Sequence, residues 1–417
     1  MKKIFLLIGI FGLLCAPRMR GQNADSLLKD HHKILEEHQH MLGNILDSLK
    51  KLRIIIGQKH GDLTYTGTSI ISQSEKEVEE PHLTIGGYVS AYYAYYSDSV
   101  GYGNFQKFPT SAPRSNQFAL NIAQLGMRYS SRSARAAVTL HYGDMPASVW
   151  SPVYNVLQEA NAGLRLNKKF WLDAGLFRTH IGLESIQPRE NITTNLAIVT
   201  FNEPYYLAGA KLSYLATDRL VLQLNAFNSY NGFVENNRKK AVGLSALYEL
   251  QKLSITFNTL WNDDTPDSST VAHGRLYNNL YAVYKTDRLI LGFEANYAFQ
   301  QNTSLDTNRR TATASMWSAL ISAKYRLINK LYAYGKVEYY QDKDEMLTGA
   351  IIDSRSKYVG LEIGGATLGV EWKPFGNSYL RLESRILSTT DREKIFRMNH
   401  AASATRQEVI AEFGVWF

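Results

Sequence analysis

The feature that most constrains this chain is an alternation of apolar and polar residues that recurs along most of its 417 residues. Between Leu289 and Phe299, for example, every second residue is leucine, phenylalanine, alanine or tyrosine, whereas Glu294 and Asn296 belong to the opposite set. A period of two predicts β-strands with one apolar face, because a helix repeats near 3.6 residues. The chain is therefore expected to be all-β from about residue 83 onward.

About sixteen such segments can be counted, and each runs for roughly ten to seventeen residues. They begin near residues 83, 116, 133, 155, 169, 205, 218, 241, 252, 275, 287, 314, 329, 357, 378 and 404. Strands of soluble proteins average only about five or six residues, whereas tilted strands that cross a bilayer need about nine to eleven. The segment lengths therefore predict membrane-spanning strands.

The connections between these segments alternate between short and long. Thr217–Asp218 and Thr286–Asp287 are short turns, whereas 98–114, 180–204 and 389–403 are long and polar. This layout, with an even strand number, is typical of outer-membrane barrels, whose short turns face the periplasm. We expect an antiparallel transmembrane β-barrel of about 16 strands over 83–417, with both of its ends on the periplasmic side.

The composition agrees with a barrel and excludes other classes. Mean hydropathy is only −0.26, yet aromatic residues make up 12% of the chain, including 26 tyrosines. Alternating faces cancel in such an average, and aromatic residues form the girdles of membrane barrels. Beyond the first two dozen residues, the sequence has no apolar run of the roughly 18 to 20 residues that a membrane helix needs.

The N-terminus predicts export. Lys2 and Lys3 precede an apolar stretch that ends at Leu14, which is typical of a secretory signal peptide cleaved after Gly21. Removing residues 1–21 also removes the one cysteine, Cys15, and leaves 42 basic against 38 acidic residues. A disulfide framework is therefore excluded, and the modest charge gives no support for nucleic-acid binding.

Residues 22–56 are predicted to form a periplasmic coiled-coil helix. Apolar residues recur every seven positions at Leu28, Leu35, Leu42, Leu49 and Ile56, which is coiled-coil spacing. The helix also contains four histidines, His31, His32, His38 and His40. Because they lack the HxxxH spacing, no metal site is expected, and the histidines are interpreted as polar layers of the coiled coil. Residues 57–82 are interpreted as a linker.

The C-terminus carries a pattern with its own meaning. Apolar residues occupy every second position, at Val409, Ala411, Phe413, Val415 and the terminal Phe417. This resembles the signal by which the barrel-assembly machinery recognises outer-membrane precursors. Phe413, Val415 and Phe417 are therefore assigned as the assembly signal, and the same spacing predicts a lipid-facing stripe.

A family resemblance rests on three stretches, which are 86–93 (GGYVSAYY), 174–184 (AGLFRTHIGLE) and 203–206 (EPYY) followed by Gly209 and Leu212. With the strand pattern of 83–417, they resemble the OmpL-like β-barrel porins common in Bacteroidetes. The resemblance implies an outer-membrane porin, but no particular solute, and it does not include the N-terminal helix.

A barrel of this size leaves an aqueous channel unless something fills it, and its inward positions are predicted to be polar. The expected pore lining comprises Asp173, Lys336, Glu338, Arg381, Glu383 and Arg385. The longest loop, 180–204, follows the fifth strand and contains Glu184, Arg189 and Glu190. We expect this loop to fold inward as a constriction that sorts solutes by charge and size; the alternative is an external loop with solvated charges.

The sequence therefore predicts a porin of a Gram-negative outer membrane that lets small hydrophilic solutes diffuse passively, as a homo-oligomer and most simply a trimer. HExxH, GxSxG and Walker A patterns are missing from the sequence, so no enzymatic activity and no cofactor are expected. The alternative is a structural or adhesive barrel that its coiled coil tethers toward the periplasm or the peptidoglycan.

Overall fold

A computed structural model describes residues 32–43, 81–98, 101, 104–235, 237–303, 312–349, 351–352, 356, 358–389, 394–398 and 401–417. The chain divides into two units, Met1–Lys59 and His60–Phe417. In the first unit, residues 32–43 are helical and every side chain is exposed. The predicted signal peptide and most of the predicted linker lie outside the described residues, and the coiled coil stays a prediction. Within the described part, no helix is long and apolar enough to cross a membrane.

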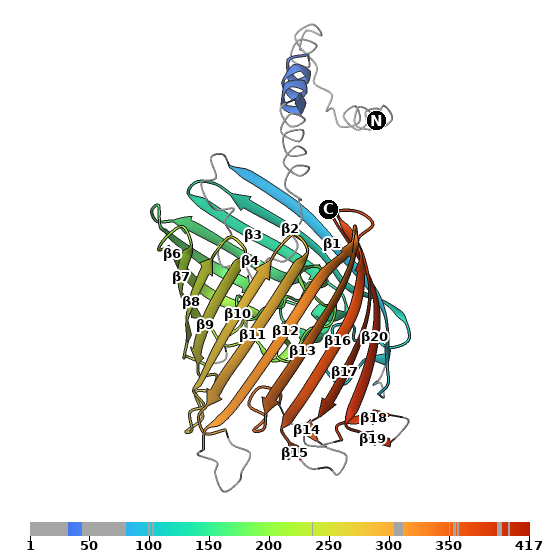
Figure 1. Ribbon diagram of the computed structural model, residues 1–417. Coiled ribbons are helices and arrows are strands. Elements are labelled where there is room, and N and C mark those ends of the chain that lie inside the picture. Colours follow the sequence, from blue (N-terminus) through green and yellow to red (C-terminus); the bar gives the residue numbers. More distant parts are fainter. Residues whose placement is uncertain are drawn as a thin grey trace, which may run out of the picture. The chain divides into compact units, whose positions relative to one another are not determined.

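The second unit is a closed antiparallel barrel of sixteen strands (Figure 1), in which each strand pairs with its neighbours in sequence and β1 pairs with β20. The strands are β1 (His82–Tyr96), β2 (Phe118–Ser130), β3 (Ala134–Tyr142), β4 (Leu157–Arg165), β5 (Phe170–Arg178), β6 (Tyr206–Leu215), β7 (Leu220–Phe227), β8 (Ala241–Glu249), β9 (Leu253–Asn262), β10 (Arg275–Lys285), β11 (Leu289–Gln300), β12 (Ala314–Ile328), β13 (Leu331–Asp342), β16 (Leu361–Trp372), β17 (Ser378–Thr389) and β20 (Thr405–Trp416).

The predicted fold class and strand number are confirmed. The largest difference in a strand start is at β16, expected near 357 and observed from Leu361. Strand lengths differ more, because β7 has 8 residues and β3, β4 and β5 have 9 each, below the expected ten.

The two faces of the wall differ as the alternation predicts. On β17, the outward Leu380, Leu382 and Ile386 are 45–53% exposed, whereas the inward Arg381 and Arg385 are at most 1% exposed. An apolar outer band with a polar interior is the arrangement of a transmembrane barrel. The outer side chains are therefore expected to face lipid.

The C-terminal residue closes the barrel. The backbone N–H of Phe417 donates to the carbonyl of Gly87 at 3.1 Å, and its carbonyl accepts from the N–H of Gly87 at 3.1 Å. The glycine at position 87 leaves room for the ring of Phe417, which a Cβ there would displace. Phe413 points outward and is 48% exposed. The assembly role of Phe413, Val415 and Phe417 stays a prediction.

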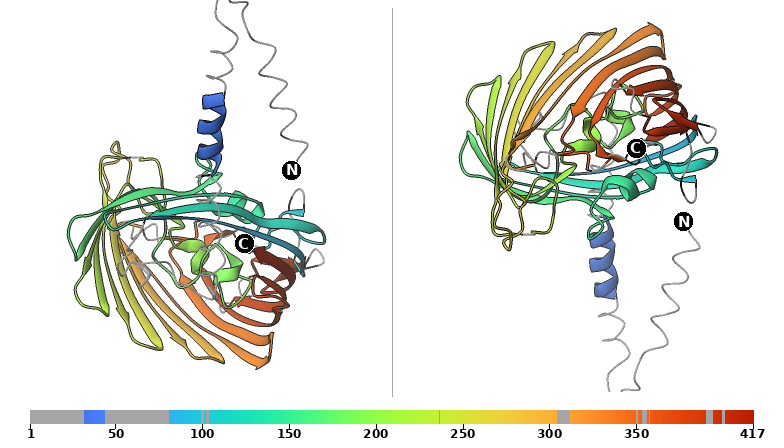
Figure 2. Two further views of the ribbon diagram at one scale, coloured as in Figure 1. Left: turned by 90° about the horizontal axis from the view of Figure 1, so that it is seen from above. Right: turned by 90° about the horizontal axis from the view of Figure 1, so that it is seen from below.

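Short turns lie at one rim and long connections at the other (Figure 1). Several long connections contain small elements, which are α3 (Asp144–Val149), η3 (Pro188–Glu190), η4 (Thr200–Asn202), and the two-stranded pairs β14 (Ile351–Ile352) with β15 (Tyr358–Val359) and β18 (Phe396–Met398) with β19 (Ala401–Ser403). The sequence pattern does not predict these elements, because they are too short for a periodic signal. Seen along the barrel, one connection occupies the interior (Figure 2).

Candidate functional site: an internal loop fixed by the barrel wall

The connection between β5 and β6, residues 179–205, folds into the barrel (Figure 2). At its base, the N–H of Thr179 donates to the carbonyl of Tyr205 at 3.1 Å. Farther in, the loop is buried almost throughout, and Asn195 and Ala197 have no exposed surface. We call residues 179–205 the internal loop.

The internal loop has a shape fixed by its own residues. Gly182 has φ +91°, a left-handed conformation that favours glycine, and a Cβ there would overlap the carboxylate of Glu203. The side chain of Asn191 accepts from the N–H of Ser185 at 2.8 Å and donates to the carbonyl of Ser185 at 2.7 Å. These contacts stabilise the bends of the loop from within the loop itself.

Carboxylates of the barrel wall hold the backbone of the internal loop. Glu294 of β11 accepts from the N–H of Leu183 at 2.9 Å, Glu338 of β13 from Ile198 at 2.7 Å, and Glu383 of β17 from Thr194 at 2.6 Å and Asn195 at 2.9 Å. Hydrogen bonds from amides to ionised acceptors are among the stronger ones. The loop is therefore anchored to strands on the far side of the barrel from β5 and β6.

Cations of the same wall hold the carbonyls of the internal loop. The guanidinium of Arg381 donates to the carbonyls of Pro188, Asn191 and Thr193 at 2.8, 3.0 and 3.3 Å. The ammonium of Lys336 donates to the carbonyl of Asn195 at 2.6 Å and to the carboxylate of Glu184 at 2.8 Å. Both acidic and basic side chains of the wall thus contact the loop directly.

Behind these contacts lies a network of buried ion pairs. It links Arg381 to Glu371 at 2.6 Å, Lys324 to Glu371 at 2.5 Å, Arg385 to Glu338 at 2.5 Å, and Arg406 to Glu408 at 3.1 Å. A buried charge without a partner costs several kcal/mol. The network therefore pairs two of the anchoring groups, Arg381 and Glu338, with groups of opposite charge.

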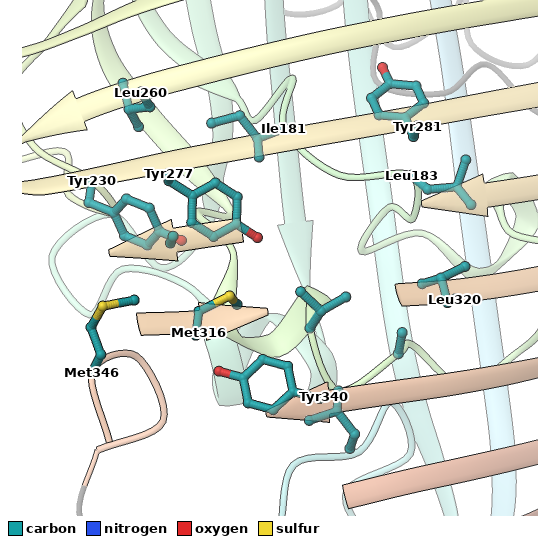
Figure 3. Close-up of a cluster of buried hydrophobic side chains, with 14 of the residues drawn as sticks. Ile181, Leu183, Tyr230, Leu260, Tyr277, Tyr281, Met316, Leu320, Tyr340 and Met346 are labelled. Carbon is teal, nitrogen blue, oxygen red and sulfur yellow. The ribbon is translucent and has the colours of Figure 1, made fainter. Parts of the chain in front are cut away.

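An apolar contact completes the packing of the internal loop. Ile181, Leu183 and Val199 pack in one buried cluster with inward side chains of β10, β12 and β13 (Figure 3). The strand residues of this contact are Tyr277, Tyr281, Met316, Leu320 and Tyr340. The loop is thus held on the wall by apolar packing as well as by polar contacts such as that of Leu183 with Glu294.

A small pocket remains at the base of the internal loop, with a lining that includes Arg178, Glu203 and Tyr205. Among the described residues, Oε2 of Glu203 and the hydroxyl of Tyr205 have no hydrogen-bond partner. Burial, together with the carboxylates of Glu294 and Glu184, raises the pKa of Glu203 well above its ordinary value. No cluster of potential metal ligands occurs in the part of the chain that the structure describes.

The three predicted constriction residues have different positions. Glu184 is buried and accepts from Lys336 and from the N–H of Ala197 at 2.5 Å. Glu190 pairs with Arg178 at 3.3 Å, and the guanidinium of Arg189 lies 4.9 Å from the ring centroid of Tyr88. All three belong to the internal loop, and Glu184 alone of them contacts the anchoring wall groups.

Of the predicted pore-lining residues, five contact the loop or its anchors, and these are Lys336, Glu338, Arg381, Glu383 and Arg385. Asp173 lies apart on β5, where its carboxylate accepts from Nε of Arg135 at 2.6 Å. All six are buried, so they contact protein groups more than solvent.

Several members of the ion-pair network are not among the predicted pore-lining residues, and Lys324, Glu371 and Arg406 are examples. Arg406 precedes Glu408 by two residues on β20, so the same alternation could have identified it as inward. Glu371 follows the inward Thr367 by four residues on β16, so the alternation places it on the same inward face. Lys324 follows the inward Ser322 by two residues on β12, so the same alternation could have identified it as well.

Comparison with known families gives one match. The family model described as "Putative beta-barrel porin-2, OmpL-like" matches residues 82–417, which is the whole barrel. No curated relative matches the sequence.

Several solved structures share the fold at low sequence identity. The outer-membrane channel DcaP of Acinetobacter baumannii has a TM-score of 0.54 at 9% identity, and covers 82% of this chain and 99% of its own. An anion-selective porin from Comamonas acidovorans has a TM-score of 0.53 at 11% identity, and the match covers 81% of this chain and 100% of that porin. The trimer form of OmpT, an outer-membrane protein of Vibrio cholerae, has a TM-score of 0.50 at 9% identity, and the match covers 81% of this chain and 100% of OmpT.

Proposed function

We propose that this chain, which belongs to the family described as "Putative beta-barrel porin-2, OmpL-like", is an outer-membrane porin. We propose further that the internal loop narrows its channel. Small hydrophilic solutes diffuse passively between the loop and the barrel wall. No catalysis and no cofactor are part of this proposal.

One observation carries the proposal, namely the anchoring of the internal loop across the interior. Its backbone N–H groups are held by Glu294, Glu338 and Glu383, and its carbonyls are held by Arg381 of the same wall. Charges of both signs at a narrow point produce a transverse field that acts on passing solutes. Glu184, Arg189 and Glu190 are proposed to define that point, and Asp173 lines the wall away from it.

Liposome swelling tests this function. Vesicles that contain the full chain are placed in isotonic solutions of sugars of increasing size, and entry of a sugar is followed by turbidity. We expect small sugars to enter faster than into protein-free vesicles, with a size limit. Failure of every sugar to enter would overturn the porin assignment and favour a structural or adhesive barrel.

The N-terminal helix supports a proposal about assembly. Residues 32–43 expose four apolar side chains, Ile34, Leu35, Met41 and Leu42, each between 47% and 57% exposed. A helix with an uncovered apolar stripe is stabilised by packing against another helix. We infer that copies of this helix form a periplasmic coiled coil and that the porin is a homo-oligomer, with a trimer as the simplest form.

Export and insertion complete the proposal. The signal peptide 1–21 directs the chain across the inner membrane and is removed, and the barrel-assembly machinery recognises Phe413, Val415 and Phe417. The exposure of Phe413 and Phe417 on the barrel supports this assignment, since a recognition signal has to be accessible. Substituting Phe417 by alanine should slow insertion in a reconstituted assembly assay more than substituting Phe375, an exposed turn residue.

A further inference from the structure

The seven short turns of the barrel are strongly basic. They contain eight lysines and arginines and two acidic residues, and each turn has at least one base. The basic residues are Arg132, Lys168, Lys169, Arg219, Lys252, Arg288, Lys330 and Lys373. The long connections of the other rim differ in that they carry both signs: 263–274 has three acidic residues and no lysine or arginine, whereas 228–240 has three basic residues and one acidic residue. The excess of bases over acids in the short turns therefore forms a basic ring at their end of the barrel.

Three of these turns share one construction. A side-chain oxygen of the first residue accepts from the N–H groups two and three residues later. Asn167 accepts from Lys169 at 2.8 Å and Phe170 at 3.2 Å, Thr217 from Arg219 at 3.2 Å and Leu220 at 3.0 Å, and Thr286 from Arg288 at 3.4 Å and Leu289 at 3.0 Å. Each turn thus places a basic residue immediately before the first apolar residue of a strand.

Further hydrogen bonds stabilise the first of these turns, which joins β4 to β5. The guanidinium of Arg165 donates to the carbonyls of Asn167 and Lys168 at 3.2 and 3.1 Å. Lys168 and Lys169 are both exposed. Because the backbone is already fixed, these two ammonium groups can bind an anion without the entropy cost of ordering the turn.

The ring lies next to exposed apolar side chains. Leu166 is 56% exposed, Ile328 65% and Phe375 70%, and each is in or beside a short turn. Such residues mark the boundary between the lipid-facing band and the turns, where the headgroups of a bilayer lie. Lysine and arginine can extend their apolar stems along this boundary while the charged group reaches a phosphate.

We propose that this basic ring binds the headgroups of anionic phospholipids in the leaflet that faces the short turns, which is the periplasmic leaflet of the outer membrane. Lysine and arginine near an anionic membrane surface each contribute roughly five-fold to binding, and the effect weakens with salt. A lipid partner fits better than a soluble one, because the ring follows the wall of the barrel and adjoins its apolar band on every side.

Lipid retention measured by native mass spectrometry tests this proposal. The full chain is reconstituted in phosphatidylcholine mixed with phosphatidylglycerol, extracted with detergent, and the bound lipids are counted. We expect wild type to retain phosphatidylglycerol in preference. A variant with Lys168→Gln, Lys169→Gln, Arg219→Gln and Arg288→Gln should reduce that preference at least five-fold, and high salt should reduce it in wild type.

A matched control removes four exposed bases from the other rim, by Lys107→Gln, Arg238→Gln, Lys240→Gln and Arg397→Gln. This variant should keep the preference for phosphatidylglycerol. Equal loss in both variants, or no preference in wild type, would overturn the proposal. Sugar permeation is measured on the same samples, so that a misfolded variant is recognised and the lipid result is judged apart from the porin function.

Discussion

At the residue scale, the interior of this barrel depends on charged side chains that bind backbone groups. Glu383 accepts two loop N–H groups, and Arg381 donates to three loop carbonyls. A peptide backbone that crosses the interior has to satisfy its polar groups. The polar side chains of the wall do so where water would otherwise be needed, and they therefore act as anchors for the internal loop.

The Lys336–Glu184 contact gives a test of this anchoring. Lys336→Met leaves the buried Glu184 without its cation, and we expect the free energy of unfolding in urea to fall by about 3–5 kcal/mol. Lys343→Met is the control, because Lys343 is 58% exposed and its pair with Glu362 should contribute at most about 1 kcal/mol. Equal, small losses in both variants would contradict the anchoring role.

Glycines beside tyrosine rings form a second residue-scale feature. On β20, a Cβ at Gly414 would lie 2.5 Å from the ring of Tyr379, its cross-strand neighbour. Gly414→Ala should therefore lower the free energy of unfolding by about 1–3 kcal/mol through overpacking. Gly364→Ala on β16 should have little effect, since the nearest atom is 3.8 Å from its Cβ; a reversed order would refute the packing argument.

At the element scale, the sequence predicts the strands well and the internal loop incompletely. Alternation is a local signal, so the start of each strand, and the inward position of Arg381 or Glu383, can be read from a few residues. The binding of Thr194 to Glu383 joins residues 189 positions apart. No local pattern predicts such a partner, and the buried, bonded state of the wall charges could not be foreseen for that reason.

The internal loop should also respond to pH through Glu203. Because the pKa of Glu203 is raised in the folded state, its carboxyl group keeps a proton as the pH rises above about 4.5, whereas the same group in the unfolded chain loses its proton there. The free energy of unfolding should therefore fall as the pH rises above that value. Glu203→Gln, which cannot ionise, should flatten the dependence and be more stable than wild type at alkaline pH. Parallel curves from urea titrations of both proteins would contradict this assignment.

At the scale of the whole molecule, the two units have different expected roles. The barrel carries the channel, and the helical residues 32–43 expose the apolar side chains that a coiled coil would cover. Deleting residues 24–56 should leave the barrel folded and convert the oligomer to a smaller species on native gels. An unchanged oligomeric state in the truncated protein would show that assembly depends on the barrel surface instead.

The fold of the whole molecule could be identified from sequence, because strand length, turn alternation and the C-terminal stripe all indicate a membrane barrel. The family could be identified through the resemblance of three short stretches, 86–93, 174–184 and 203–206. The small elements at the long-loop rim could not be identified, and α3 is an example. Its six residues, Asp144–Val149, are too few for a helical period, and it is held by contacts such as that of Met145 and Trp150 with Tyr206. These are tertiary contacts that no local pattern encodes.

The central claim is that the internal loop narrows a water-filled channel, and single-channel conductance in planar bilayers tests it most directly. Residues 181–203 are replaced by a short glycine–serine linker, which leaves the Thr179–Tyr205 bond at the loop base in place. The control is a similar replacement within 263–274, a connection at the same rim. We predict a higher conductance and a larger solute size limit for the first variant only. Equal conductance in wild type and both variants would contradict the claim.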